Sequence, residues 1–246
     1  RIGSQILTHY PETIQIAKTI TSQEAALDTR KSSTIFIPEL AKDILEQIVF
    51  EARKSEFVDV KSGVSARLSI TAFENLVSTA ERRLLHSGDD KTGIRMSDFT
   101  GIIPAITGKI ELVYEGEQEG AYNVALTLLG NAIKSLYSEF FPKIEKIEKQ
   151  GVESPYDEIV SWFFNHSEDF EILDDISEKD YRSILEKVKP LSEFVLKYQV
   201  GVTPEEVCFW QEFVLWSLVE HKKLSKYRYA EGVQFKDPYG SFISGL

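Results

Sequence analysis

The chain has little cysteine and no long apolar run. Cys208 is the only cysteine among 246 residues, which excludes an internal disulfide, a CxxC redox pair and a multi-thiolate metal site. Such cysteine usage favours a reducing compartment, and we expect a cytoplasmic protein. A membrane-spanning helix needs about 18 or more consecutive apolar residues. Glu212 interrupts one candidate run and Asn165 and His166 another, so we expect no membrane segment.

Positive charge and methionine are also scarce. The chain has 28 Lys and Arg against 39 Asp and Glu, a formal net charge of -11. This excess of negative charge repels a phosphate backbone, so extended nucleic-acid binding is disfavoured. Met96 is the only methionine, the chain opens on Arg1, and no basic segment followed by an apolar targeting run is found. We therefore expect these residues to belong to a longer protein.

Apolar residues spaced three and four apart predict a mainly α-helical fold. Helices are expected over residues 11–28, from Pro38 to about 52, from residues 62–65 to about Gly88, over a short stretch from Ser97, and over 121–140, 156–164, 178–198 and 203–227. Pro190 should kink or divide the helix that contains it. Extended segments are expected over residues 1–10 and 34–37. The tail, residues 229–246, has no period and should be irregular but docked by its aromatic side chains.

A glycine-spaced run over residues 108–120 interrupts the helical pattern. Ile110, Leu112 and Tyr114 occupy alternate positions there, among the charged residues Lys109, Glu111 and Glu115, which predicts a junction. The expected organisation is therefore a first helical unit over residues 1–112 and a C-terminal helical domain over residues 113–246.

The inventory of catalytic motifs is small. The four histidines, at positions 9, 86, 166 and 221, form no HExxH motif, and no serine lies in a GxSxG elbow. Gly108 and Lys109 look like the end of a phosphate loop, but Ile110 follows where Ser or Thr is required. We expect structural histidines, no phosphate loop in this chain and no metal site.

An acidic tract over residues 151–178 contains nine Asp or Glu and no Lys or Arg. Divalent cations prefer oxygen ligands, but no DxDxDG-like loop orders these carboxylates. A solvated acidic face or a surface for a basic partner protein is therefore expected in place of a calcium or magnesium site.

Arg67 lies in the segment Gly63 to Ser69, within the first turn of the expected third helix. Free N–H groups and the positive end of the helix dipole favour an anion there. An arginine at this position is electrostatically unfavourable unless an anion lies nearby. Two interpretations stay open: a phosphate-binding arginine, or a side chain that reaches into solvent.

Four segments carry a family resemblance: RIGSQILTHYPETIQIAKTIT, IPELAKDILEQIVFEAR, SGVSARLSITAFENLVSTAERR and ITGKIELVYEGEQEG. They resemble the later part of AAA+ ATPases of the magnesium chelatase ATPase subunit and MoxR group. The likeness covers about residues 1–120. It implies an upstream α/β core with the phosphate loop and Walker B acids, which binds ATP and Mg²⁺, followed by a helical lid. It further implies that Arg1 is the catalytic arginine finger and that Arg67 is the nucleotide-binding sensor 2 arginine.

The resemblance also implies a function for the parent protein. A ring-forming homo-oligomer would couple ATP hydrolysis to remodelling of partner proteins, or to metal or cofactor insertion into them. The 246 residues alone should not hydrolyse ATP. Residues 121–246 match no motif; they either pack on the lid and support assembly, or present the acidic tract (153–178) to a protein partner. The alternative is a non-enzymatic, all-helical interaction module that uses the acidic surface, in which Arg67 is incidental.

Overall fold

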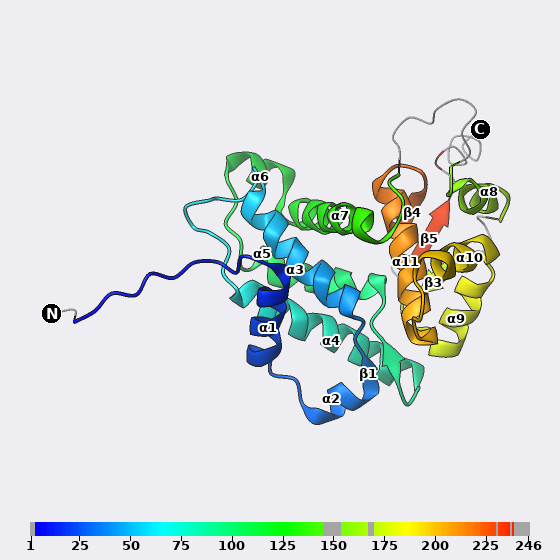
Figure 1. Cartoon of the computed structure of the whole chain (residues 1–246), viewed down its shortest axis with the longest axis horizontal. Helices are drawn as coiled ribbons and strands as arrows, with labels where there is room; N and C mark the ends of the chain where they lie inside the picture. The colour runs from blue at the N-terminus through cyan, green and yellow to red at the C-terminus, as the bar shows by residue number, and fades with distance from the viewer. Residues whose placement is uncertain (1–2, 145–153, 167–169, 230, 237, 239–246) are drawn as a thin grey trace.

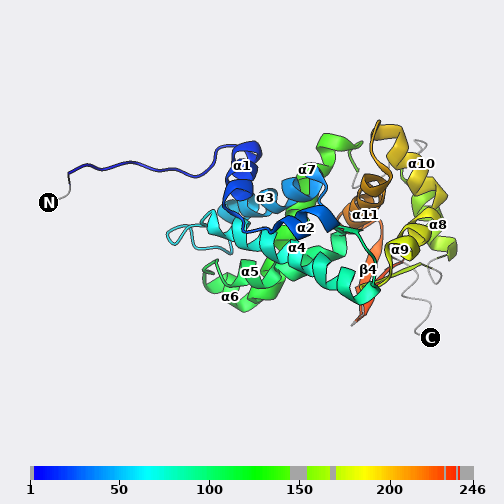
Figure 2. The same cartoon turned by 90° about the horizontal axis from the view of Figure 1, so that it is seen from below.

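The helical periodicity of the sequence corresponds to a mainly α-helical chain in the computed structural model, which describes residues 3–144, 154–166, 170–229, 231–236 and 238. Residues 3–10 form an extended N-terminal arm that projects from the helical body (Figure 1, Figure 2). Ile6 and Leu7 of the arm are exposed.

The first group of elements precedes Gly120. Its helices are α1 (Ile14–Glu24), α2 (Thr29–Thr34), α3 (Glu39–Lys54), α4 (Arg67–Ser87), the 3-10 helix η1 (Met96–Ile102), α5 (Ile103–Thr107) and α6 (Tyr114–Glu119). Two short strands, β1 (Ile35–Phe36) and β2 (Thr92–Gly93), pair in parallel. The extended segment predicted over residues 34–37 is therefore strand β1, and it lies beside α4.

The second group begins with the long helix α7 (Ala121–Phe140). It continues with α8 (Asp157–His166), β3 (Glu171–Leu173), α9 (Glu178–Glu186), α10 (Lys189–Tyr198), α11 (Pro204–Glu220), β4 (Ser225–Arg228) and β5 (Gly232–Lys236). The three strands form an antiparallel sheet in the order β3-β5-β4, with Ile172 opposite Val233 and Lys226 opposite Phe235.

Local signals explain where several of these helices begin and end. Thr203 and Glu206 form a reciprocal capping box at the start of α11, where the sequence predicts that a helix begins. Pro190 occupies the first turn of α10 and separates it from α9, which confirms the predicted division of residues 178–198. Gly88 ends α4 with a φ of 73°, a conformation that glycine adopts without a steric penalty.

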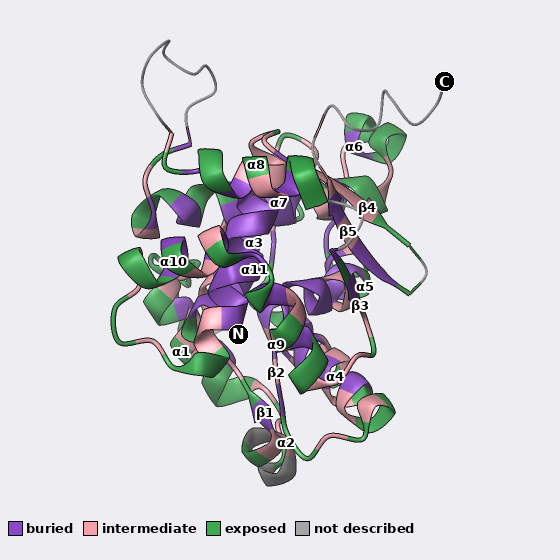
Figure 3. Ribbon diagram, turned by 90° about the vertical axis from the view of Figure 1, so that its right-hand side faces the viewer, coloured by how far each residue is buried: buried purple, intermediate pink, exposed green. Residues whose placement is uncertain are grey.

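Helix α7 joins the two groups through a shared core. It packs against α3 of the first group and against α11 of the second. Figure 3 shows buried stretches of these helices gathered near the centre of the molecule. One hydrophobic cluster runs from Ile35 to Phe235 and includes residues on both sides of the predicted boundary at residue 112. The two groups of elements are therefore packed on a continuous apolar interior.

The end of α11 and the tail differ from the sequence prediction. The helix ends at Glu220, before the expected residue 227, because Lys222 takes a φ of 61° and the Lys223 and Leu224 N–H groups turn back to the Leu218 carbonyl. Residues 225–228 and 232–236, expected to continue the helix and then be irregular, instead form the paired strands β4 and β5. Gly232 allows this hairpin to approach β3, since a Cβ there would lie 2.6 Å from the Ile172 carbonyl oxygen. The expected docking of residues 239–246 lies outside the described residues.

The junction run over residues 108–120, where the sequence predicted an interruption of the helical pattern, contains a short helix. Leu112 pairs with Val58 in an isolated antiparallel bridge, but residues 114–119 form helix α6. Gly116 is required on this helix because a Cβ would lie 2.5 Å from the Phe57 carbonyl oxygen. The conformation of this segment therefore depends on close packing against Phe57, which is distant in sequence, more than on the alternation of apolar residues over positions 110–114.

Within the described part of the chain, no helix combines the length and the apolar character that crossing a bilayer demands.

Replacing Phe213 with alanine should lower the free energy of unfolding by about 3–5 kcal/mol, the usual cost of removing a buried phenyl ring. Phe213 is fully buried on α11, and its ring centre lies 5.7 Å from that of Tyr137 on α7. Urea titration monitored by circular dichroism measures this loss. Phe164→Ala is the matched control, because Phe164 is 68% exposed; equal losses in the two variants would contradict this assignment of the core.

Candidate functional site

Arg67 is the first residue of α4, and its side chain is exposed. The Arg67 N–H donates to Ser65 Oγ at 3.2 Å, while Ala66 at the N-cap offers no side-chain bond. The first turn of α4 contains no acidic residue, and we find no ion pair to the Arg67 guanidinium among the described residues. An exposed guanidinium beside the positive end of a 21-residue helix suits an anionic ligand.

The loop before α4 is held by its own hydrogen bonds. The Asp59 carboxylate accepts from the Lys61 N–H at 2.9 Å and from Ser62 Oγ at 3.0 Å. These bonds, that from the Lys61 N–H first, lower the pKa of Asp59. The Asp59 N–H donates to the Glu111 carbonyl at 2.8 Å. The loop is thus tied to the segment that leads into α6.

A buried carboxyl group, Glu46 on α3, orients the first turn of α4. It accepts hydrogen bonds from Thr21 Oγ1 on α1 at 2.5 Å and from Ser69 Oγ at 2.7 Å. Burial raises the pKa of Glu46, against the opposing effect of these two bonds. Ser69 lies two residues after Arg67, so Glu46 connects the start of α4 to both α1 and α3.

The second expected site residue, Arg1, lies outside the described residues. Of the two arginines predicted from the sequence, Arg67 is therefore the one whose surroundings the structure describes. The Ser65 hydroxyl accepts its hydrogen bond from the N–H of Arg67 itself.

Three of the four histidines have hydrogen-bond partners close in sequence, and the cysteine is buried. His166 and His221 each bond through Nδ1 to the backbone carbonyl four residues earlier, and His9 to the carbonyl of Tyr10. Burial raises the pKa of Cys208 to about 12, so this thiol is a poor nucleophile near neutral pH. No group of three or more His, Cys, Asp or Glu side chains in the described ranges is arranged to hold a metal ion.

The acidic tract is divided between internal contacts and solvent. Asp174 binds Arg228 through both oxygens, at 3.0 and 2.6 Å. Asp157, Glu158 and Glu171 are exposed. Residues 153, 168 and 169 lie outside the described part of the chain.

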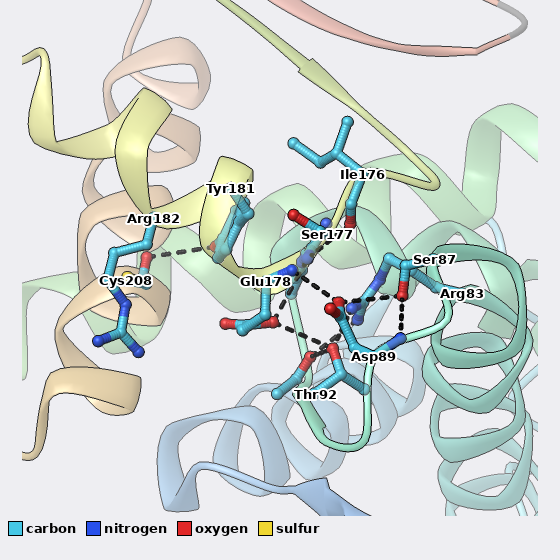
Figure 4. A network of polar contacts seen from close by, with 12 residues as sticks. Arg83, Ser87, Asp89, Thr92, Ile176, Ser177, Glu178, Tyr181, Arg182 and Cys208 are labelled. Carbon is cyan, nitrogen blue, oxygen red and sulfur yellow. Dashed lines mark hydrogen bonds and ion pairs between the residues drawn. The ribbon is translucent and has the colours of Figure 1, made fainter.

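A buried polar network joins the first group of elements to α9. Arg95, only 1% exposed, donates through Nη2 to the Ile176 carbonyl at 3.1 Å and to the Glu178 carboxylate at 3.3 Å. Its guanidinium also lies 4.1 Å from the centre of the Tyr181 ring. Figure 4 shows Glu178 and Tyr181 at the start of α9 and Ile176 just before it, with Glu178 next to Thr92.

The same network includes the end of α4. Arg83 forms a buried ion pair with Asp98 at 2.7 Å and binds the Thr92 hydroxyl. Thr92 Oγ1 donates to the Glu178 carboxylate at 3.1 Å, and the Glu178 N–H donates to Asp89 at 2.8 Å (Figure 4). Helix α4 is therefore anchored through Arg83 to the elements that face α9.

Glu212 on α11 completes this connection. One of its oxygens accepts from the Met96 N–H and from the Tyr181 hydroxyl, both at 2.8 Å. Burial raises the pKa of Glu212 above the ordinary glutamate value of 4.5. The carboxyl group thus joins η1, α9 and α11 at one atom.

A cleft with a volume of about 540 Å³ opens beside the network, within the size range of small-molecule pockets. Residues of β1 and β2 line one side; Glu178, Arg182 and Glu205 line the other. The two carboxylates that line the cleft, Glu178 and Glu205, offset the formal positive charges of Lys91 and Arg182. The charge of the lining therefore favours neither an anionic nor a cationic ligand. Sequence reasoning missed this cleft because its walls come from segments that are far apart in the chain, from Ser33 at one extreme to Glu205 at the other.

Comparisons of the chain with family models, curated proteins and solved structures found no match. The residues best suited to bind a ligand are then those at the start of α4. An exposed cation, the positive end of a helix dipole and a fixed first turn occur together there.

Replacing Glu212 with glutamine should change how stability depends on pH. A carboxyl group whose pKa is higher in the folded state binds its proton more tightly there, so its contribution to stability falls as pH rises above the unfolded value. Glutamine does not titrate, so Glu212→Gln should gain about 1 kcal/mol or more over the wild type between about pH 5 and pH 7. Urea titrations at the two pH values measure the difference.

Glu139→Gln is the control, because Glu139 is exposed on α7 and its replacement should leave the pH dependence close to that of the wild type. A stability difference between Glu212→Gln and wild type that stays constant with pH would contradict the buried titration.

Proposed function

We propose that this chain is the helical lid and C-terminal helical region of an AAA+ ATPase of the magnesium chelatase ATPase subunit and MoxR group. One observation carries the proposal: Arg67 is an exposed arginine at the first position of α4, in a segment that resembles the sensor 2 segment of that group. In this proposal, residues 1–112 comprise the end of the ATPase core and the lid, and residues 113–246 form the C-terminal helical domain.

Arg67 would act on the nucleotide of its own subunit. Phosphoryl transfer requires stabilisation of charge on the γ-phosphate, and a guanidinium supplies a permanent positive charge with paired donors. The bond between Glu46 and Ser69 supports this role, since it fixes the turn from which Arg67 projects. ATP and Mg²⁺ would be held mainly by the preceding α/β core, and no residue of this chain is assigned to Mg²⁺.

Arg1 would act on the nucleotide of a neighbouring subunit in a ring homo-oligomer. The polar network of Arg83, Arg95 and Glu212 supports a lid that moves together with the C-terminal helices, because separating them would leave buried charges without partners. A change of lid angle on ATP hydrolysis would then displace the C-terminal surface. That displacement is the step we assign to remodelling, or to metal or cofactor insertion in a partner protein.

The alternative, a non-enzymatic interaction module, would use the acidic tract as its binding surface. Asp174 and Glu178 of that tract bind Arg228 and Arg95 within the chain. These contacts reduce the charge available to a partner and favour the ATPase proposal.

In the full-length protein, Arg67→Ala should lower the ATPase rate by at least about tenfold, because the variant lacks a charge that stabilises the transferring phosphoryl group. Steady-state turnover at saturating ATP measures the effect. Arg82→Ala is the matched control, since Arg82 is another exposed arginine of α4, and it should retain nearly full activity. Unchanged turnover in Arg67→Ala would refute the sensor assignment and leave the interaction module as the better account.

The role of Arg1 can be tested by mixing subunits. Subunits carrying Arg1→Ala would be combined with subunits whose Walker lysine is replaced; each population should be inactive alone. Activity should return in the mixture, because an intact arginine finger from one subunit can serve an intact phosphate loop in its neighbour. Absence of recovery in mixed rings would count against a finger that acts between subunits.

A further inference from the structure

Tyr10, at the base of the N-terminal arm, contacts the segment that leads into α4. Its hydroxyl oxygen accepts a hydrogen bond from the Val64 N–H at 3.2 Å, across 54 positions of sequence. Val64 is buried, at 1% exposure, whereas Tyr10 is 49% exposed. Because Val64 lies three residues before Arg67, this bond joins the arm to the turn that precedes Arg67.

Arg53, at the end of α3, binds both members of this contact. Its Nε donates to the Val64 carbonyl at 3.2 Å, and its guanidinium carbon lies 4.2 Å from the centre of the Tyr10 ring. The two polar groups of Val64 are thereby held, the N–H by Tyr10 and the carbonyl by Arg53. Stacking on the ring also keeps the Arg53 cation in place.

Gly63 provides the space that this arrangement needs. Its φ is 68°, and a Cβ at this position would overlap the Tyr10 hydroxyl oxygen. Residues with side chains rarely adopt this backbone conformation. The glycine is therefore required by both its conformation and its neighbour.

We infer that Tyr10, Arg53 and Gly63 form a latch that fixes Arg67 relative to the N-terminal arm. The three are positioning residues, since they act on Arg67 through the backbone of Val64. The latch leaves the Arg67 side chain exposed while it restrains the backbone on which that side chain stands.

The functional part of this inference rests on the proposed function. There, the arm follows Arg1, which would contact the nucleotide of a neighbouring subunit, and Arg67 would contact the nucleotide of its own. A displacement of the arm would reach Arg67 through Tyr10 and Val64. The latch would thus couple two adjacent nucleotide sites in the ring.

The first test uses the 246-residue chain without nucleotide and measures amide hydrogen exchange at Val64. Tyr10→Phe keeps the aromatic ring but removes the hydroxyl, so exchange at Val64 should be about fivefold faster, as expected for loss of one hydrogen bond. Tyr114→Phe is the matched control, because Tyr114 is also exposed and its hydroxyl accepts from Gln118. Unchanged exchange at Val64 in Tyr10→Phe would overturn the latch.

The second test measures turnover in the full-length protein with a double-mutant cycle. Tyr10→Phe alone should lower kcat by about fivefold, and adding it to Arg67→Ala should cause no further loss, because it acts through Arg67. Independent, multiplicative losses would overturn the coupling. The two failures are distinguishable: unchanged turnover in Arg67→Ala refutes the proposed function, whereas exchange at Val64 tests the latch without reference to ATP.

Discussion

The burial of Arg95 is the constraint on which the packing of the two groups of elements depends. A buried cation without partners costs several kcal/mol, and Arg95 is 1% exposed. Its compensation comes from α9 and the residues just before it: the Glu178 carboxylate, the Ile176 carbonyl and the Tyr181 ring. Tyr181 in turn donates to Glu212, which also accepts from the N–H of the residue after Arg95. Moving α9 away would remove these three contacts of the Arg95 guanidinium and the Tyr181 hydrogen bond to Glu212, and would leave Glu212 its bond from the Met96 N–H.

Helix α4 connects this buried network to the exposed Arg67. One end of the helix carries the exposed Arg67, whereas Arg83 near the other end is buried in its ion pair with Asp98. At about 1.5 Å of rise per residue, the two arginines are separated by about 24 Å along a continuous helix. Through hydrogen bonds of Arg83 to Thr92 and of Thr92 to Glu178, the far end of α4 is connected to the start of α9. In the proposed ATPase, this helix is the path by which nucleotide chemistry would reach the C-terminal helices.

The sequence was sufficient for features with a local physical cause. The spacing of apolar residues predicted α7, a helix was expected to begin at residue 203 where α11 starts, and Arg67 was expected in the first turn of the helix that is α4. The β4–β5 hairpin was missed because its strands are short and charged, and its pairing depends on β3 sixty residues earlier. The network around Arg95 and the contact of Tyr10 with Val64 could not be predicted either. Nothing near Arg95 or Tyr10 in the sequence indicates a distant partner.

The arginines of the described chain differ in how their charge is used, and this difference bears on Arg67. Arg83 and Arg95 are buried with carboxylate partners, and Arg53 is stacked on Tyr10 and bonded to a carbonyl. Each of these guanidinium groups holds two or more elements together. Arg67 makes no such contact among the described residues, although a cation in the first turn of a helix is disfavoured by about 0.3–1 kcal/mol. Because the surrounding contacts fix the backbone at Arg67 while its side chain stays exposed, the arrangement is better suited to a ligand than to stability of the fold.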